Sequence, residues 1–245
     1  MAKIHFIYFD IDTGSYPGVN HGLASLTAVL REDGHTVSLH HLYKLEPEDN
    51  FVTIALRSEA DIIGFSFATN QRGCVDKYSR AIYSKMKILQ IAGGIHPTMD
   101  PIDTLKIGYI KGVCIGEGEN SLRDVLKCID NKQDYMGLPG FWWRQHDGII
   151  VRNQIPPLEE KISKFPYPDY SVFDTNRIAS ASSGWISMML VRGCPYDCYY
   201  CCNHVLRSIY PNKKYYLRFP EAEYAIDIIK HNLTYYNKVN GINCT

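Results

Sequence analysis

The 245-residue sequence predicts an α/β protein that begins with a flavodoxin- or Rossmann-like doubly wound parallel sheet. Short apolar runs, which favour strands, alternate with amphipathic stretches of roughly ten residues, which favour helices. Glycine-rich loops follow several of the apolar runs. Because strands joined by helices of this length pair in parallel, we expect a sheet covered by helices on both faces.

Strand and helix signals alternate along the chain up to residue 135. The strands span 3–9, 36–41, 60–67, 88–92 and 113–115, and the helices span 21–32, 74–85 and 121–129. A Gly/Pro/Asp-rich loop runs through Gly18 before the first helix, and Gly34 follows that helix as a C-terminal signal. Five strands in this pattern fit a flavodoxin-like fold, in which ligands bind beyond the carboxyl ends of the strands.

Three loops at those strand ends carry candidate ligand-binding residues. The first offers hydroxyl groups, the second has paired glycines that let the backbone approach a ligand, and the third opens a helix whose N-terminal amides suit a phosphate. Each loop by itself is more often a plain chain reversal, so the prediction depends on the set. The candidates are Ser66, Thr69, Gly93, Gly94, Gly116, Glu117 and Gly118.

After residue 135 the sequence no longer shows this pattern of strands and helices. We therefore expect three domains or segments, at 1–135, 136–180 and 181–245. The middle segment combines a hairpin around 138–152 with a proline-rich extended linker. After it, residues 185–191 predict a buried strand and Pro220–His231 a helix with Pro220 at its N-terminus. Residues 241–245 predict a second strand.

Three closely spaced cysteines follow the strand at 185–191, in a C-x3-C-x2-C pattern formed by Cys194, Cys198 and Cys201. Three thiolates can hold a cubane iron–sulfur cluster and leave one iron without a protein ligand. Zinc is the alternative, with Cys202 or His204 as a fourth ligand, although structural zinc sites usually combine two separated ligand pairs. The eight cysteines are otherwise scattered, which argues against a disulfide framework.

The cysteine pattern, with the aromatic Tyr200 before its third cysteine, resembles the signature of radical S-adenosylmethionine (SAM) enzymes. The resemblance implies a [4Fe-4S] cluster on the three cysteines, SAM at the open iron and Tyr200 near the SAM adenine. It also implies that the strand at 185–191 begins a partial (β/α) barrel. Only 44 residues follow Cys201, so we expect a chain truncated within this core and inactive alone.

The N-terminal loops resemble the cobalamin-binding domain that precedes the radical SAM core in one subfamily. The matching strings are Gly34-His35, Asp61–Ser66, Gly93–Pro97 and Ile115–Glu119. The resemblance implies that the loop residues named above contact cobalamin. The D-x-H-x-x-G string, whose histidine binds cobalt in other cobalamin proteins, is absent from the sequence, and we do not expect His96 to be an axial ligand.

Together these resemblances imply a radical enzyme that methylates or rearranges an unactivated carbon of a small-molecule or natural-product substrate. The electron donor would be a flavodoxin or ferredoxin, and no residue of this chain is assigned as a catalytic acid or base. The alternative is a non-catalytic cobalamin- or nucleotide-binding module whose cysteine loop holds zinc.

Charge and hydropathy narrow the classes of partner. Acidic and basic residues balance at 26 each, which argues against a nucleic-acid surface. No apolar run is long enough for a membrane span. Since no signal peptide opens the sequence, we expect a cytoplasmic protein.

Overall fold

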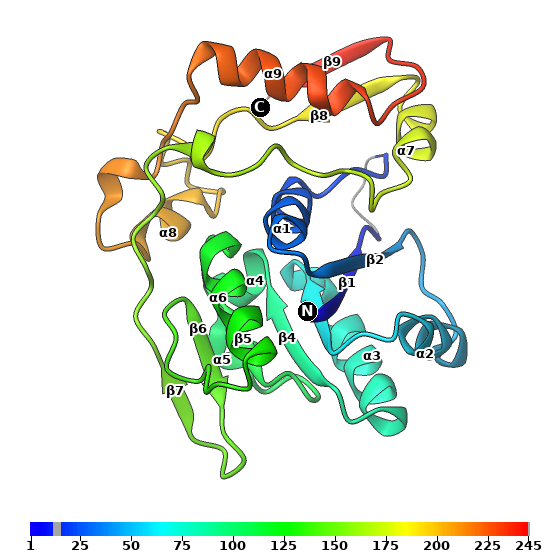
Figure 1. Ribbon diagram of the computed structural model, residues 1–245, viewed down its shortest axis with the longest axis vertical. Coiled ribbons are helices and arrows are strands. Elements are labelled where there is room, and N and C mark those ends of the chain that lie inside the picture. Colours follow the sequence, from blue (N-terminus) through cyan, green and yellow to red (C-terminus); the bar gives the residue numbers. More distant parts are fainter. Residues whose placement is uncertain (12–15, 245) are drawn as a thin grey trace. The chain divides into compact units, whose positions relative to one another are not determined.

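The computed structural model describes residues 1–11 and 16–244 as an α/β protein with two sheets (Figure 1). Residues 12–15 of the predicted loop before Gly18, and Thr245 of the last predicted strand, lie outside the described residues. The chain forms two compact units. The first comprises 1–11 and 33–156, and the second comprises the described residues of 12–32 and 157–245.

The first unit is built on a seven-stranded sheet with the order β2-β1-β3-β4-β5-β6-β7. Its strands are β1 (Lys3–Phe9), β2 (Thr36–Leu42), β3 (Ile62–Ser66), β4 (Leu89–Gly93), β5 (Gly112–Cys114), β6 (Phe141–Arg144) and β7 (Ile150–Arg152). The first five pair in parallel, in the 2-1-3-4-5 order of flavodoxin-like folds. The predicted doubly wound sheet is therefore confirmed.

The helices of the first unit include the two predicted there, α3 and α6, and four short or unassigned ones in addition. They are α2 (Glu48–Arg57), η1 (Thr69–Gln71), α3 (Arg72–Lys85), α4 (Ile95–Met99), α5 (Pro101–Thr104) and α6 (Glu119–Asp130). The sequence analysis did not assign α2, η1, α4 or α5, of which α2 is the longest. Helix α2 places acidic residues in its first turn and buries Phe51. Tyr78 of α3 stacks on Phe51 at a centroid distance of 3.9 Å and on Phe9 of β1 at 6.0 Å, so these helices pack together against β1.

The predicted hairpin is formed by β6 and β7, which pair antiparallel and extend the sheet beyond β5 (Figure 1). Trp143 of β6 is buried at 1% exposure, and its ring lies over Gly112 of β5. A Cβ atom at Gly112 would overlap that ring. The glycine therefore leaves the space that the indole fills, which attaches the hairpin to the parallel sheet.

The second unit contains a parallel pair of strands, β8 (Trp185–Met188) and β9 (Gly241–Cys244), with a long helix between them in sequence. Its helices are α1 (His21–Glu32), η2 (Ile162–Lys164), α7 (Thr175–Ala181), α8 (Asn203–Ser208), η3 (Lys213–Tyr215) and α9 (Ala222–Leu233). Met188 and Ile186 of β8 pack with Ile229 and Leu233 of α9 in a small core. This is one βαβ unit; that it begins a barrel stays a prediction.

Two details of the second unit differ from the sequence expectation. The strand predicted as buried over 185–191 ends at Met188, and its side chains alternate, with Trp185 51% exposed and Ile186 3% exposed. A strand with one face on a core and one face open has this period of two. Pro220 precedes Glu221, the N-cap of α9, and so lies outside the helix.

The proline-rich segment, which includes residues 155–158 and 165–170 and contains four prolines, is extended as predicted, apart from the short η2 turn. It bonds to α1 and to the chain after α9, all within the second unit. The Asp169 carboxylate accepts from the Arg31 guanidinium at 2.6 Å and from the Tyr235 hydroxyl at 3.2 Å. These contacts group α1 with the second unit rather than with the strands that flank it in sequence.

Candidate functional site

The three candidate loops lie at one edge of the first unit's sheet. Ser66 ends β3 and Gly93 ends β4, and the two are Cα partners in the parallel register. The third loop follows β5, and Gly118 is the N-cap of α6. Because parallel strands point the same way, their carboxyl ends bring the three loops to the same edge. All seven candidate residues keep part of their surface exposed, above strands that are buried.

Hydrogen bonds link the three loops to one another. The Thr69 hydroxyl lies 3.1 Å from Nδ1 of His96, which joins the first loop to the second. The Thr98 hydroxyl accepts from the backbone N–H of Gly116 at 3.0 Å, which joins the second loop to the third. The predicted loops thus form a connected set with a defined geometry.

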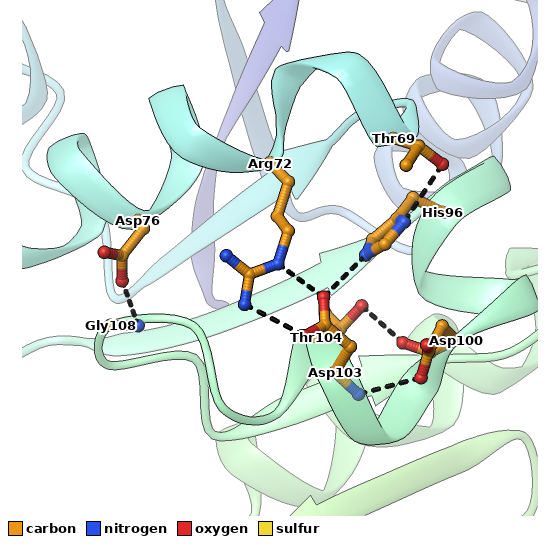
Figure 2. Close-up of polar contacts among 8 residues, drawn as sticks. All are labelled: Thr69, Arg72, Asp76, His96, Asp100, Asp103, Thr104 and Gly108. Atoms are coloured by element: carbon orange, nitrogen blue, oxygen red, sulfur yellow. Dashed lines mark hydrogen bonds and ion pairs between the residues drawn. The ribbon is translucent and has the colours of Figure 1, made fainter.

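His96 lies at the centre of this set, and both of its ring nitrogens have partners (Figure 2). Nε2 lies 3.3 Å from a carboxylate oxygen of Asp103, which also forms a two-point pair with the Arg72 guanidinium. The hydrogen bond from Arg72 holds the pKa of Asp103 below its usual value. His96 therefore links the first two loops to α5, the arrangement expected of a packing residue.

Gly94 shows why the second loop needs glycine. Its φ of +101° lies in the left-handed region that favours glycine, and a Cβ there would lie 3.3 Å from backbone atoms of Phe67. Its own loop packs against the chain after β3, where the His96 N–H donates to the Phe67 carbonyl at 3.3 Å. Close approach between these two loops therefore requires glycine at this position.

The cysteine loop of the second unit is held at its start by a tight backbone contact. Gly193 has a φ of +85°, and a Cβ there would overlap the carbonyl oxygen of Tyr216. Beside it, Arg192 and Arg218 exchange backbone hydrogen bonds of 3.1 and 2.9 Å. These contacts position the loop that carries the cysteines.

The loop itself presents thiols and aromatic rings to solvent. Cys194, Cys198 and Cys201 are free and partly exposed, and Tyr200 is 91% exposed. The Cys201 N–H donates to the Cys198 carbonyl at 3.0 Å, which closes a turn between these two cysteines. In the described part of the chain, no three Cys, His, Asp or Glu side chains are gathered closely enough to hold a metal ion.

The sulfur of Cys201 has hydrogen-bond donors close to it. The Asn203 side-chain amide donates to Sγ of Cys201 at 3.4 Å. The backbone N–H of Asn203, followed by this amide, lowers the pKa of the Cys201 thiol. Burial and the adjacent Cys201 raise the pKa of Cys202 instead. The hydrogen bonds from Asn203 favour the thiolate form of Cys201 over the thiol.

Sequence analysis did not identify Arg72, Asp103 and Asn203, the polar residues that contact members of the two candidate sites, Arg72 through Asp103. Arg72 and Asp103 lie on different helices, and only the fold brings them together. Asn203, two residues after the last cysteine of the pattern, was close enough in sequence to be considered. None of the helices that the structure describes has the length and apolar character needed to cross a membrane.

Comparison with protein families and curated sequences yields two matches. Residues 10–126 match the family model described as the B12 binding domain. The chain is 25% identical over 185 residues to an uncharacterized methyltransferase of Pyrococcus horikoshii. That alignment covers 74% of this chain and 39% of the relative.

Solved structures with the same fold include two enzymes. The cobalamin-dependent SAM radical enzyme OxsB, with aqua-cobalamin and SAM bound, matches with a TM-score of 0.79 at 19% identity, over 100% of this chain and 34% of its own. The radical SAM methyltransferase TsrM of Kitasatospora setae, with tryptophan and a SAM analogue bound, matches with a TM-score of 0.72 at 16% identity. That match covers 99% of this chain and 47% of TsrM. The chain thus spans about two fifths of the curated relative and a third to a half of these enzymes.

Proposed function

We propose that this chain, which carries a B12-binding domain at residues 10–126 and has the fold of cobalamin-dependent radical SAM enzymes, binds both cobalamin and an iron–sulfur cluster. The observation that carries the proposal is the match of the B12-binding domain to the part of the chain that contains all three linked loops. In doubly wound folds, ligands bind at this edge of the sheet.

For cobalamin, the loops have the character that a large polar cofactor requires. The residues that would hold it are Ser66, Thr69, Gly93, Gly94, Gly116, Glu117 and Gly118. They combine exposed backbone, hydroxyl groups and the start of the twelve-residue helix α6, whose N-terminus favours a phosphate. Because His96 is held on both ring nitrogens, it is assigned to support the loops and not to bind cobalt.

For the cluster, the donor set fits in its chemistry. Cys194, Cys198 and Cys201 are free, accessible thiols in one loop, and soft thiolate ligands select iron–sulfur clusters and zinc. Three ligands would leave one iron open to SAM, with Tyr200 near the adenine. When bound, the cluster supplies an electron to SAM and the corrinoid a transferable methyl group. The chain's own part is to bind these groups, orient them and exclude water.

The activity that we propose is methyl transfer to, or radical rearrangement of, an unactivated carbon of a small-molecule substrate. The methyltransferase description of the Pyrococcus horikoshii relative and of TsrM supports the first of these. A flavodoxin or ferredoxin would supply electrons. The alternative, a non-catalytic module with zinc in the cysteine loop, is not favoured, because the proteins of similar fold are radical SAM enzymes.

Metal analysis tests both cofactors at once. The chain would be purified without oxygen, incubated with iron, sulfide and hydroxocobalamin, desalted, and analysed for iron, cobalt and zinc. We expect about four irons, as in one cubane, and about one cobalt per chain. Iron without cobalt would reject the corrinoid, and zinc in place of iron would reject the cluster.

Substitutions assign the iron to the proposed ligands. Cys198→Ala removes one of the three thiolates and should abolish the charge-transfer absorbance and most of the bound iron. Cys128→Ala, which makes the same change in helix α6 of the first unit, is the matched control and should keep its iron. Retention of four irons by Cys198→Ala would contradict the assignment.

A further inference from the structure

The sulfur of Cys201 is the end of a short chain of hydrogen bonds in the second unit. The Asn203 amide nitrogen donates to Cys201 Sγ at 3.4 Å, and the Tyr216 hydroxyl donates to the Asn203 amide oxygen at 2.9 Å. Asn203 is the first residue of α8, and Tyr216 is buried at 8% exposure just after η3. Cys201, the nearby Asn203 and the more distant Tyr216 are therefore connected in series.

The two contacts require the same orientation of the Asn203 amide. An amide oxygen accepts and an amide nitrogen donates, and the assignment of the two ends follows from their partners. A thiolate sulfur can only accept, so it requires the nitrogen. The Tyr216 hydroxyl can donate, so it suits the oxygen. Each contact thus stabilises the orientation that the other one needs.

Tyr216 also contacts the beginning of the cysteine loop. Its carbonyl oxygen occupies the space that a Cβ at Gly193 would take, directly before Cys194. Its hydroxyl reaches Asn203, directly after the cysteine pattern. One buried tyrosine therefore touches the loop on both sides of the three cysteines. This contact limits the freedom of the segment that carries Cys201 and its donor.

We propose that Asn203 is a positioning residue for the iron–sulfur cluster. Its side-chain amide donates an N–H to the sulfur of Cys201, and Tyr216 orients this amide. The inference rests on the proposed function, because it requires a cluster on the cysteine loop. Hydrogen bonds to ligand sulfurs tune the reduction potential of such clusters. A donor stabilises the more negatively charged reduced state, so Asn203 makes the cluster easier to reduce.

An electrochemical titration tests this inference without any measurement of turnover. The full chain, reconstituted with iron and sulfide, is reduced stepwise in the presence of mediators, and the reduced cluster is quantified by electron paramagnetic resonance. The variants are Asn203→Leu, which removes the donor, and the isosteric Asn203→Asp, which replaces it with a carboxylate. Iron content is measured for each sample, so that only loaded protein is compared.

We expect the ratio of reduced to oxidised cluster at the wild-type midpoint to fall about tenfold in Asn203→Leu, which equals 59 mV for a one-electron couple. Asn203→Asp should give a larger fall, because the carboxylate repels the added electron. The matched control is Asn212→Asp, which adds the same charge elsewhere in the second unit and can still accept from the Lys214 N–H as Asn212 does at 3.0 Å. It should change the ratio far less than Asn203→Asp.

Tyr216→Phe tests the series arrangement. Removal of its hydroxyl should lower the ratio in the same direction as Asn203→Leu but to a smaller extent, and should have no further effect when Asn203 is already leucine. A Tyr216→Phe effect of the same size in both backgrounds would show that Tyr216 acts independently, which refutes the orientation step.

The outcomes separate this inference from the proposed function. Loaded Asn203 variants with the wild-type midpoint would overturn the role of Asn203 and leave the cluster assignment intact. A wild-type chain that takes up no iron would overturn the cluster assignment and the inference together. If Asn203→Leu fails to fold, Asn203→Asp and Tyr216→Phe, which preserve side-chain size, still decide the question.

Discussion

Acidification should weaken the first unit through His5, a histidine of β1 that is buried at 3% exposure. Its Nδ1 lies 2.8 Å from the Ser38 hydroxyl, whereas Nε2 is buried and has no hydrogen-bond partner among the described residues. Burial, and to a smaller extent the nearby His40 ring at 6.4 Å, lower the pKa of His5 from 6.5 to about 4. The neutral ring is therefore the form that the folded state accepts.

The magnitude follows from the linkage between protonation and folding. Well above pH 6.5 the His5 ring is neutral in both the folded and the unfolded state, so its titration does not change the free energy of unfolding. As the pH falls below 6.5, the unfolded chain binds the proton first and the folded state loses stability. At pH 5 the loss is roughly 2 kcal/mol, and it levels off at roughly 3 kcal/mol below pH 4, where both states are protonated.

The assay compares wild type with His5→Gln, which removes the titration, by urea unfolding at pH 7 and pH 5. Tryptophan fluorescence is a suitable signal, because Trp143 is buried in the same unit. The free energy of unfolding should fall between the two pH values by roughly 2 kcal/mol more in wild type than in His5→Gln. His146→Gln, at an exposed position in the β6–β7 turn, controls for the substitution itself. Equal pH dependence of wild type and His5→Gln would refute the reasoning.

Three further predictions follow from contacts described above. Trp143→Ala should lower the free energy of unfolding of the first unit by about 3–5 kcal/mol, since it empties the space over Gly112. Urea unfolding followed by circular dichroism measures this, and a loss below about 1 kcal/mol would contradict the packing role. Gly193→Ala should reduce iron uptake and destabilise the second unit by roughly 1–3 kcal/mol, because the φ of +85° and the Tyr216 carbonyl leave no room for a methyl group. Full iron loading of this variant would show that the loop tolerates the change. Asp103→Asn should lower the affinity for cobalamin severalfold, on the order of 1 kcal/mol, because it alters the partner of His96; retention of cobalamin on gel filtration measures this. Retention equal to wild type would mean that the loops are positioned without the Asp103 carboxylate.

Local pattern in the sequence was enough to predict the parallel sheet and its loops. The runs at β1 to β5 are buried because they are apolar, and that character is visible in the sequence. The helical spacing of the leucines in α1 likewise involves only a few neighbouring residues. The cysteine spacing is local in the same sense. Such signals survive without tertiary context, because burial and backbone geometry act on short segments.

Contacts between distant segments were not predictable in this way. The addition of β6 and β7 to the sheet depends on the fit of Trp143 over Gly112, residues 31 positions apart. The grouping of α1 with the proline-rich segment depends on Arg31 and Asp169, and no local pattern marks such a pair. Side-chain packing and hydrogen bonding select these partners from many that the sequence allows.

The sequence by itself determined the fold class, the loops at the sheet edge and the three cysteines, because each is a pattern within a short stretch of chain. Only the tertiary structure decided which polar groups from other segments contact them: Asp103 beside His96, and Tyr216 on the amide of Asn203. The physical reason is that a hydrogen bond requires two groups at one distance and angle, and for residues apart in sequence only the folded chain sets both.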